Sequence, residues 1–262
     1  MIKNCPICSS KRDVYFTATI INKYEVSYLY CNNCGLLQTE YPYWLEEAYS
    51  SAIADADTGL VARNIAISKR LACIIFFFFD PQGRYLDVAG GYGMLTRLMR
   101  DIGFDFYWSD LYCENIFAKG FEASTTTNEF CAITAFEVLE HIYNPIEFIQ
   151  KSIKDAGTST IIFSTDLFEG NPPQPENWWY YAFNTGQHIS FYQARTIQFI
   201  ADKLSMFFYS YKTIHILTYK QIHHHILLRI MAGRLGNIGY EYVRKRMNSK
   251  ILTDHNTLLR KL

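Results

Sequence analysis

The chain has 262 residues, and its 25 Lys and Arg balance its 25 Asp and Glu, so the formal net charge is zero. Hydrophobic residues form 49% of the sequence, which excludes an intrinsically disordered chain. The longest strongly apolar run, residues 71–79, is too short to span a bilayer, while the length allows one large domain and a smaller one.

Two C-x-x-C pairs mark the N-terminal segment. Twenty-two residues separate the first pair, Cys5 and Cys8, from the second, Cys31 and Cys34. Four thiolates in this pattern are typical of a closed, tetrahedral zinc site. Disulfides or a redox pair are the alternatives, but the N-terminus lacks an apolar signal segment, which predicts a cytoplasmic protein with reduced thiols. We therefore expect a structural zinc ribbon over residues 1–42.

Helical and alternating patterns follow the ribbon. Apolar residues recur at helical spacing through Leu60, Leu71 and Ile74, which predicts a helical linker over residues 43–80. Strand and helix patterns then alternate over residues 81–211, so we expect a mostly parallel sheet in this core domain.

A glycine-rich turn follows the first strand of this core. The strand ends near Asp87, and Gly90, Gly91 and Gly93 lie in the turn before a helix expected to begin near Thr96. Glycines let the backbone turn tightly and approach a ligand closely. Amide N–H groups at a helix start favour a nucleotide-like cofactor, for which such corners are the usual site in α/β sheets.

Two further strands carry acidic residues at their ends. The segment 104–109 reads as a second strand that ends at Asp110, where a carboxylate can accept hydrogen bonds from the two ribose hydroxyls of a nucleotide. The segment 131–136 and the acidic run after it resemble the fourth strand and the following helix of small-molecule methyltransferases. A helix is expected over Glu137-Val138-Leu139-Glu140-His141-Ile142, directly after that strand.

These residues resemble the motifs of class I S-adenosylmethionine-dependent methyltransferases, over about residues 60–210. The first motif of that family reads D/E-x-G-x-G-x-G; here Ala89 replaces the first glycine, and we expect an ordinary φ there. The resemblance implies a Rossmann-like, doubly wound α/β fold with a mostly parallel, seven-stranded sheet. It also implies S-adenosylmethionine as cofactor, bound by Asp87, Ala89, Gly91, Gly93, Asp110, Leu111 and Phe136.

An aromatic block follows the fifth strand, residues 161–164. Its large rings can stack on the C–H faces of sugars or on planar rings, and they are Trp178, Trp179, Tyr180 and Tyr181. The block, the following segment 186–192 and the N-terminal ribbon are similar to a ribbon-bearing subgroup with sugar and polysaccharide-pathway enzymes. This similarity implies a small-molecule or glycan acceptor with the block as its platform; a packed hydrophobic loop is the alternative.

The chemistry of methyl transfer demands few residues. An alcohol acceptor needs a general base, and His188 and His141 are the candidates, although a lone histidine in a loop can be purely structural. We therefore expect O-methylation of a hydroxyl, with transfer to a sugar carbon as an alternative.

A divalent metal site is a second interpretation of the same residues. If residues 137–142 are helical, Glu137, Glu140 and His141 share one face, and His188 can complete a magnesium or manganese site there. RNA-end and quinone-ring O-methyltransferases resemble this pattern. The alternative is that Glu140 and His141 cap and solvate a helix.

Two other functions remain as alternatives. An RNA- or DNA-directed methyltransferase would fit the ribbon and the basic tail, but the position after the fourth strand lacks the D/N-P-P-Y/F motif of amino-directed DNA enzymes, which argues against nucleic acid. A non-catalytic cofactor-binding module is the other, and the presence of both Asp87 and Asp110 argues against it.

The C-terminal segment completes the prediction. A helix is expected over residues 193–204, strand character over 206–219, and an amphipathic helix from Gln221. Residues 212–262 contain ten Lys and Arg but only Glu241 and Asp254 as acids, so this segment carries +8 and the rest of the chain −8. A solvated basic face, contact with an anionic sugar nucleotide or lipid-linked glycan, and dimerisation are the alternatives for this extension.

Overall fold

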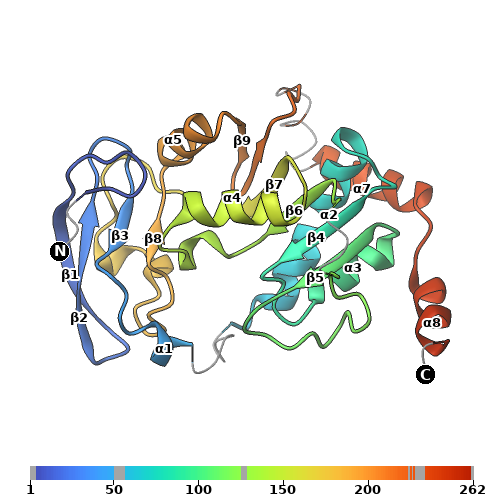
Figure 1. The fold of residues 1–262 in the computed structure, drawn as a ribbon, viewed down its shortest axis with the longest axis horizontal. Coiled ribbons are helices and arrows are strands. Elements are labelled where there is room, and N and C mark those ends of the chain that lie inside the picture. Colours follow the sequence, from blue (N-terminus) through green and yellow to red (C-terminus); the bar gives the residue numbers. More distant parts are fainter. Residues whose placement is uncertain are drawn as a thin grey trace. The chain divides into compact units, whose positions relative to one another are not determined.

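The structure is a computed structural model, and it describes residues 4–49, 57–124, 129–223, 225, 227 and 234–260. Two sheets and the helices around them make up these parts of the chain (Figure 1). The strands are β1 (Asp13–Ile20), β2 (Tyr24–Tyr30), β3 (Leu37–Thr39), β4 (Arg84–Val88), β5 (Asp105–Ser109), β6 (Ala132–Ala135), β7 (Thr160–Ser164), β8 (Ser190–Phe191), β9 (Phe207–Tyr211) and β10 (Ile214–Thr218). The α-helices are α1 (Leu45–Ala48), α2 (Leu60–Phe78), α3 (Met94–Ile102), α4 (Pro145–Asp155), α5 (Ala194–Leu204), α7 (Arg234–Arg246) and α8 (Ile251–Leu259).

The larger sheet has the strand order β5-β4-β6-β7-β10-β9. β4 pairs in parallel with both β5 and β6, and β9 pairs with β10 as an antiparallel hairpin. The central strands β6 and β7 are fully buried, as expected for a sheet covered on both faces. The predicted mixed α/β fold with a mostly parallel sheet is therefore confirmed.

Six strands, not the expected seven, form this sheet in the described residues. After β5 the chain makes only an isolated parallel bridge, between Trp108 and Glu122. The segment between them is held in turns instead, because the side chain of Asn115 binds Ala118 N and Glu122. Residues 125–128 lie outside the described residues.

Contacts divide the chain into two compact units, each assembled from separate stretches, whereas the sequence analysis used consecutive segments. The first contains residues 1–54, 136–151 and 162–219; the second contains 55–135, 152–161 and 220–262. Parts of the linker predicted at 43–80 and of the basic extension predicted at 212–262, namely 50–56, 224, 226, 228–233 and 261–262, lie outside the described residues.

The first unit contains a second sheet with the order β1-β2-β3-β8. β8 follows His188 closely and pairs with β3, so the N-terminal ribbon is completed by a strand from much later in the chain. The hydrophobic core of this unit joins the N-terminal ribbon to the later stretch of the chain. Val26, Tyr28 and Leu37 of the ribbon pack with Tyr181 and Phe191 there.

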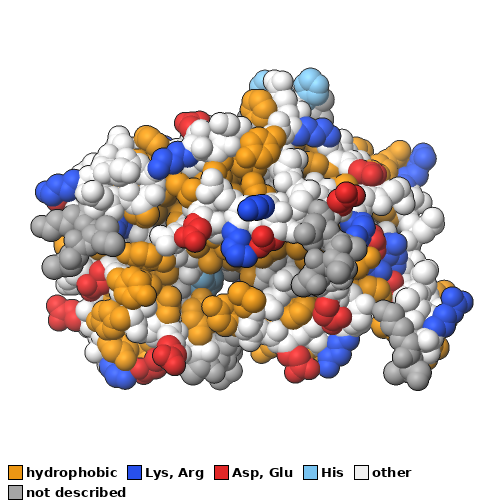
Figure 2. All heavy atoms as spheres, in the orientation of Figure 1, with side chains coloured by type: hydrophobic (Ala, Val, Ile, Leu, Met, Phe, Trp, Pro, Cys, Tyr) orange, Lys and Arg blue, Asp and Glu red, His pale blue; other side chains and the backbone are white. Residues whose placement is uncertain are grey.

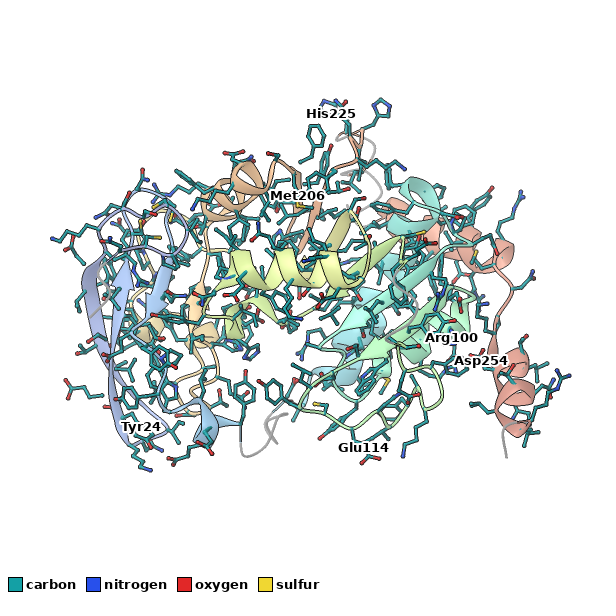
Figure 3. The ribbon with its side chains drawn as sticks, viewed as in Figure 1. Tyr24, Arg100, Glu114, Met206, His225 and Asp254 are labelled. Carbon is teal, nitrogen blue, oxygen red and sulfur yellow. The ribbon has the colours of Figure 1, made fainter. Side chains whose placement is uncertain are left out.

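The second unit packs α2 against α3 and α7. α8 is attached differently, because Asp254 is its only buried residue and binds Arg100 of α3. Figure 3 shows these two side chains pointing toward each other. None of the helices in the described parts of the chain has the length and apolarity that a bilayer span requires.

Two helix predictions need correction. α3 begins at Met94, two residues before the expected start at Thr96. The helix expected over residues 137–142 is only a 3-10 turn, Leu139–His141. The reason is that Glu137 has a left-handed φ of 56° and Ile142 is extended, so neither residue can lie in a right-handed helix.

Candidate active site

The turn between β4 and α3 forms a cradle of left-handed residues. The φ angles are 53° at Ala89, 54° at Gly91 and 85° at Gly93. The expectation of an ordinary φ at Ala89 is therefore wrong. The turn demands a left-handed residue at this position, where the related motif has glycine. An alanine accepts that conformation at a cost of roughly 1 kcal/mol.

Gly90 is required for close packing rather than for its φ. A Cβ at Gly90 would lie 2.8 Å from Cδ1 of Trp108 and 2.9 Å from Oδ2 of Asp87. Trp108 in turn donates its indole N–H to the carbonyl oxygen of Gly91, at 2.9 Å. Trp108 thus holds the turn in its conformation. The sequence analysis missed this role, because a tryptophan within a strand belongs to no motif with a fixed spacing.

Asp110 connects the end of β5 to the same turn. Its Oδ2 accepts the N–H of Gly91 at 2.9 Å, and its Oδ1 accepts the N–H groups of Tyr112 and Cys113 at 2.7 and 2.9 Å. A carboxylate has about four acceptor positions, so one position on Oδ2 is left for a ligand hydroxyl. Leu111 beside it is 90% exposed.

Asp87 lies beneath the turn. The carboxyl is buried and accepts a hydrogen bond from Thr134 Oγ1 at 2.6 Å. Burial raises the pKa of Asp87 to about 7, against the opposing effect of the bonds from Thr134 and Thr96. We infer that Asp87 supports the turn from below. Phe136, the other predicted cofactor residue, begins the second stretch of the first unit, and its cofactor role stays a prediction.

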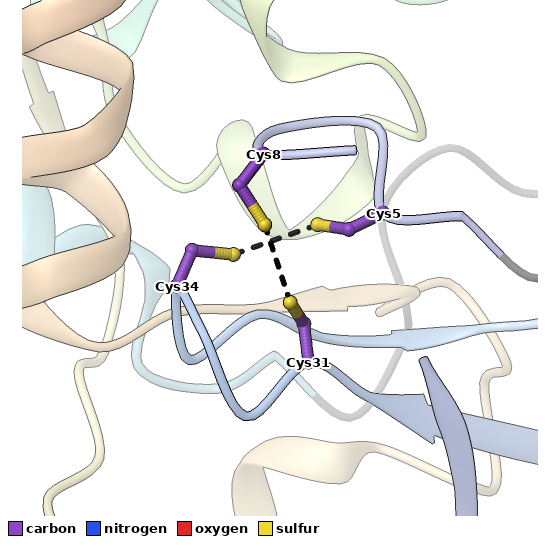
Figure 4. A group of neighbouring side chains, drawn as sticks. All are labelled: Cys5, Cys8, Cys31 and Cys34. Carbon is purple, nitrogen blue, oxygen red and sulfur yellow. Dashed lines mark hydrogen bonds between the residues drawn. The ribbon is translucent and has the colours of Figure 1, made fainter. Parts of the chain in front are cut away.

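The four ribbon cysteines converge (Figure 4). Their sulfur atoms lie within 4.8 Å of one another, with 3.5 Å between Cys5 and Cys34 and 3.4 Å between Cys8 and Cys31. A tetrahedron with metal–sulfur bonds of ~2.3 Å has edges of roughly 3.8 Å, so the group fits a metal ion. The hydrogen bond with Cys34 lowers the pKa of Cys5 to about 5, which favours one thiolate even without a metal.

A second group in the same unit contains Glu140, His141 and His188. Their ligand atoms also lie within 4.8 Å of one another, and the two imidazole rings meet edge to face at 4.8 Å. Three of the predicted catalytic or metal residues are therefore brought together. Glu137 is not part of the group; it instead accepts a hydrogen bond from Ser164 Oγ.

Backbone carbonyls fix the tautomer of both histidines. Nδ1 of His141 lies 3.1 Å from the carbonyl oxygen of Gln187, and Nδ1 of His188 lies 2.7 Å from that of Tyr180. A carbonyl can only accept, so each Nδ1 carries a hydrogen, and a ring in its neutral form then has its lone pair on Nε2. A histidine that binds a metal or accepts a proton through Nε2 has this arrangement, in which the other ring nitrogen donates its hydrogen.

Burial controls the charge of this group. It raises the pKa of Glu140 to about 8, with the charge of Glu137 as a second cause. It also lowers the pKa of His141 to about 3, with His188 as a second cause. Neither carboxyl oxygen of Glu140 has a hydrogen bond of full bonding geometry among the described residues, although Tyr180 is near enough to oppose part of the rise in its pKa. A buried carboxyl with so little support is costly, and a bound cation or acceptor hydroxyl would offset that cost.

The aromatic block is divided by the structure. Tyr180 and Tyr181 are buried in the core of the first unit, where their hydroxyls meet Thr165 and the carbonyl oxygen of Pro173. Trp178 is half-buried against them, and Trp179 is 77% exposed. The platform role predicted for the block thus rests on the two tryptophans.

Comparison with known proteins identifies a family. Residues 63–204, more than half of the chain, match the family described as "Methyltransferase domain". The chain therefore belongs to this family of methyltransferase domains. A comparison with curated protein sequences finds no match.

Several solved structures are similar to part of the chain. TnmH is 13% identical, with a TM-score of 0.47 over 68% of this chain and 62% of its own. The mitomycin 7-O-methyltransferase MmcR is 10% identical, with a TM-score of 0.45 over 66% and 59%. The magnesium protoporphyrin IX methyltransferase ChlM from Synechocystis, solved with bound SAM, is 13% identical, with a TM-score of 0.36 over 68% and 91%. The chain thus spans about three-fifths of the length of TnmH and of MmcR.

Proposed function

We propose that this methyltransferase methylates a hydroxyl group of a sugar, a glycan precursor or a related small molecule. The observation that carries the proposal is the convergence of Glu140, His141 and His188, with Nδ1 of each histidine bonded to a backbone carbonyl and Nε2 left to accept a proton. A hydroxyl acceptor needs a group that removes its proton, and this cluster supplies one.

The cofactor residues are proposed to lie around the turn after β4. Bound S-adenosylmethionine supplies an already activated methyl group. The free acceptor position on Oδ2 of Asp110 suits one ribose hydroxyl, and Leu111, exposed directly beside it, offers an apolar side chain for the adenine. Ala89, Gly91 and Gly93 bring the backbone close to the ligand. Asp87 and Trp108 keep the turn in shape.

His188 is the proposed general base, through Nε2. Its Nδ1–H bond to Tyr180 orients the ring and stabilises the positive charge that develops when Nε2 takes the acceptor proton. His141 is less suited to this role, because burial lowers its pKa to about 3 and keeps it neutral. We infer that His141 and Glu140 bind the acceptor group and orient it.

The same three residues also fit a divalent cation such as magnesium or manganese. Two Nε2 lone pairs and one carboxylate are a common donor set for such ions, with further positions open to solvent or acceptor. A cation there would lower the pKa of an acceptor hydroxyl and hold Glu140 ionised. Glu137 is left out of this proposed donor set because its carboxylate accepts a hydrogen bond from Ser164 Oγ instead.

Exposed aromatic rings of the first unit support a sugar-like acceptor. Tyr41, Tyr43 and Trp179 are 72%, 58% and 77% exposed. Figure 2 shows hydrophobic side chains gathered at the lower left, over the ribbon sheet and α1. Such rings stack on the C–H faces of sugars and need no charge on the ligand.

We propose a structural zinc ion at Cys5, Cys8, Cys31 and Cys34. Four thiolates close the coordination sphere, so this ion would cross-link the ribbon and take no part in the chemistry.

The test begins with cofactor binding and ends with product. Calorimetry should detect S-adenosylmethionine but not NAD, and a radiolabelled methyl group should pass to a panel of free sugars, nucleotide-sugars and phenols. Methylation confined to amines, with no labelled ether product from any hydroxyl compound, would contradict the hydroxyl proposal while leaving the cofactor assignment intact.

A further inference from the structure

Gln38 lies in the middle of β3 and is completely buried. Its Oε1 accepts a hydrogen bond from Arg12 Nη1 at 2.7 Å, and its Nε2 donates to the carbonyl oxygen of Tyr143 at 2.7 Å and to Ser190 Oγ at 3.0 Å. Arginine only donates and a carbonyl only accepts, so these partners fix the orientation of the amide. Every polar atom of the side chain is used.

The two acceptors of Gln38 occupy equivalent places in the chain. Tyr143 is two residues after His141, and Ser190 is two residues after His188. Ser190 Oγ passes its own hydrogen on to the carbonyl oxygen of Ile142, at 2.7 Å, which closes a small ring of bonds. One glutamine side chain therefore ties together the two segments that carry the histidines.

The ribbon backbone reinforces this link. The N–H of Thr39 donates to the carbonyl oxygen of Ile189 at 3.0 Å, and Gln38 is paired with Ser190 in the β3–β8 ladder. The Nδ1–H bond of His141 is made to the carbonyl oxygen of Gln187, in the segment of His188, so the orientation of His141 depends on how the two segments lie relative to each other. A slip of one segment would move one ring relative to the other, and sites of this kind tolerate errors of only about 0.5 Å.

We propose that Gln38 is a positioning residue that holds His141 and His188 in a shared geometry and in the Nδ1–H tautomer. The proposal rests on the proposed function of these two imidazoles. It gives the N-terminal ribbon a task in the reaction, because β3 follows the Cys34 thiol by only three residues.

Three variants separate positioning from folding. Gln38→Glu keeps an acceptor for Arg12 but removes both donors toward the histidine segments. Ser190→Ala removes one of those links and preserves the packing, so it decides the question if Gln38→Glu does not fold. Thr196→Val is the matched control, because buried Thr196 Oγ1 also binds the ribbon, at the carbonyl oxygen of Cys34, 2.8 Å away, but touches neither histidine segment.

The readout is the ¹⁵N NMR signal of the imidazoles in the full chain, assigned with His141→Asn and His188→Asn, together with titration of Mn²⁺. Gln38→Glu and Ser190→Ala should shift both rings away from the Nδ1–H tautomer and weaken Mn²⁺ binding about tenfold or more. Thr196→Val should do neither. Unchanged ring signals in both variants, or an equal change in Thr196→Val, would overturn the proposal. A wild-type chain that binds no Mn²⁺ argues against the divalent site alone, because the ring signals still decide the role of Gln38.

Discussion

Arg100 of α3 binds Asp254 of α8 through two parallel hydrogen bonds, from Nε to Oδ2 at 2.8 Å and from Nη2 to Oδ1 at 2.7 Å. Both side chains are only 5% exposed, and Arg97 adds a third bond to Oδ2. The apolar residues Ile251, Leu252 and Leu259 of α8 are 55%, 75% and 54% exposed. A charged contact, rather than an apolar face, therefore attaches this helix.

Replacing Asp254 with Ala should destabilise the protein by about 1–3 kcal/mol, because the buried Arg100 loses two of its hydrogen bonds and keeps only those to Asp105 and to the carbonyl oxygen of Phe106. Burial opposes ionisation of Asp254, but the bonds from Arg100 and Arg97 outweigh it and hold its pKa below the ordinary value. The contribution is thus present above pH ~4 and is lost as the pH falls through the lower folded pKa. Urea unfolding measures the loss. Glu241→Gln, which breaks an exposed pair with Arg244, should cost less than about 1 kcal/mol, and an equal loss in both variants would contradict the argument.

Asp87 should give the opposite pH dependence. Its pKa is about 7 in the folded protein and ~3.9 in an unfolded chain, so the folded state binds more protons between these values. Stability from this group is then complete below pH ~4 and is lost as the pH rises toward 7. Asp87→Asn should remove this fall of the free energy of unfolding with pH. The variant should therefore be more stable relative to wild type at pH 8 than at pH 5. Asp202→Asn on the surface of α5 serves as control, and parallel pH profiles for Asp87→Asn and wild type would refute the assignment.

Features set by short stretches of sequence were predicted, whereas features set by contacts between distant residues were not. The C-x-x-C spacing predicted a cysteine group because each pair lies within one turn, and the strand ends at Asp87 and Asp110 followed from short patterns. Gln38 and Trp108 were missed because their partners are set by strand register, which no local pattern encodes. Ala89 was misjudged because the turn, rather than the residue type, dictates its φ.

Asp110→Ala should weaken S-adenosylmethionine binding by roughly 1–3 kcal/mol, since a ribose hydroxyl loses its acceptor. Isothermal calorimetry is the measurement. Asp101→Ala, on the surface of α3, should leave the affinity unchanged. Equal affinities for Asp110→Ala and wild type would remove Asp110 from the cofactor site.

The purified protein should contain about one zinc ion per chain, with zinc–sulfur distances of ~2.3 Å by X-ray absorption. Cys34→Ser should lose the metal and lower the melting temperature, because the ribbon loses its cross-link. Cys131→Ser, outside the cluster, should keep it. If removing metal from the wild-type protein leaves its melting temperature unchanged, the zinc assignment is wrong.

His188→Ala should lower kcat by about 10²–10⁴ if Nε2 is the general base, with cofactor affinity nearly intact. If a divalent cation acts there instead, a chelator should abolish activity and magnesium or manganese should restore it. His255→Ala on α8 is the control. A wild-type rate in His188→Ala, combined with indifference to chelators, would leave catalysis to positioning alone.

The pairing of β3 with β8 also has a consequence for biosynthesis. Gln38 and Ser190 are 152 residues apart, and a ribosome adds about 5–20 residues per second. The ribbon therefore emerges roughly 8–30 s before its last strand exists, with the edge of β3 unpaired. A metal ion captured early by the cysteines would protect this nascent sheet until the histidine segment arrives, so zinc supply during translation should govern the yield of folded enzyme.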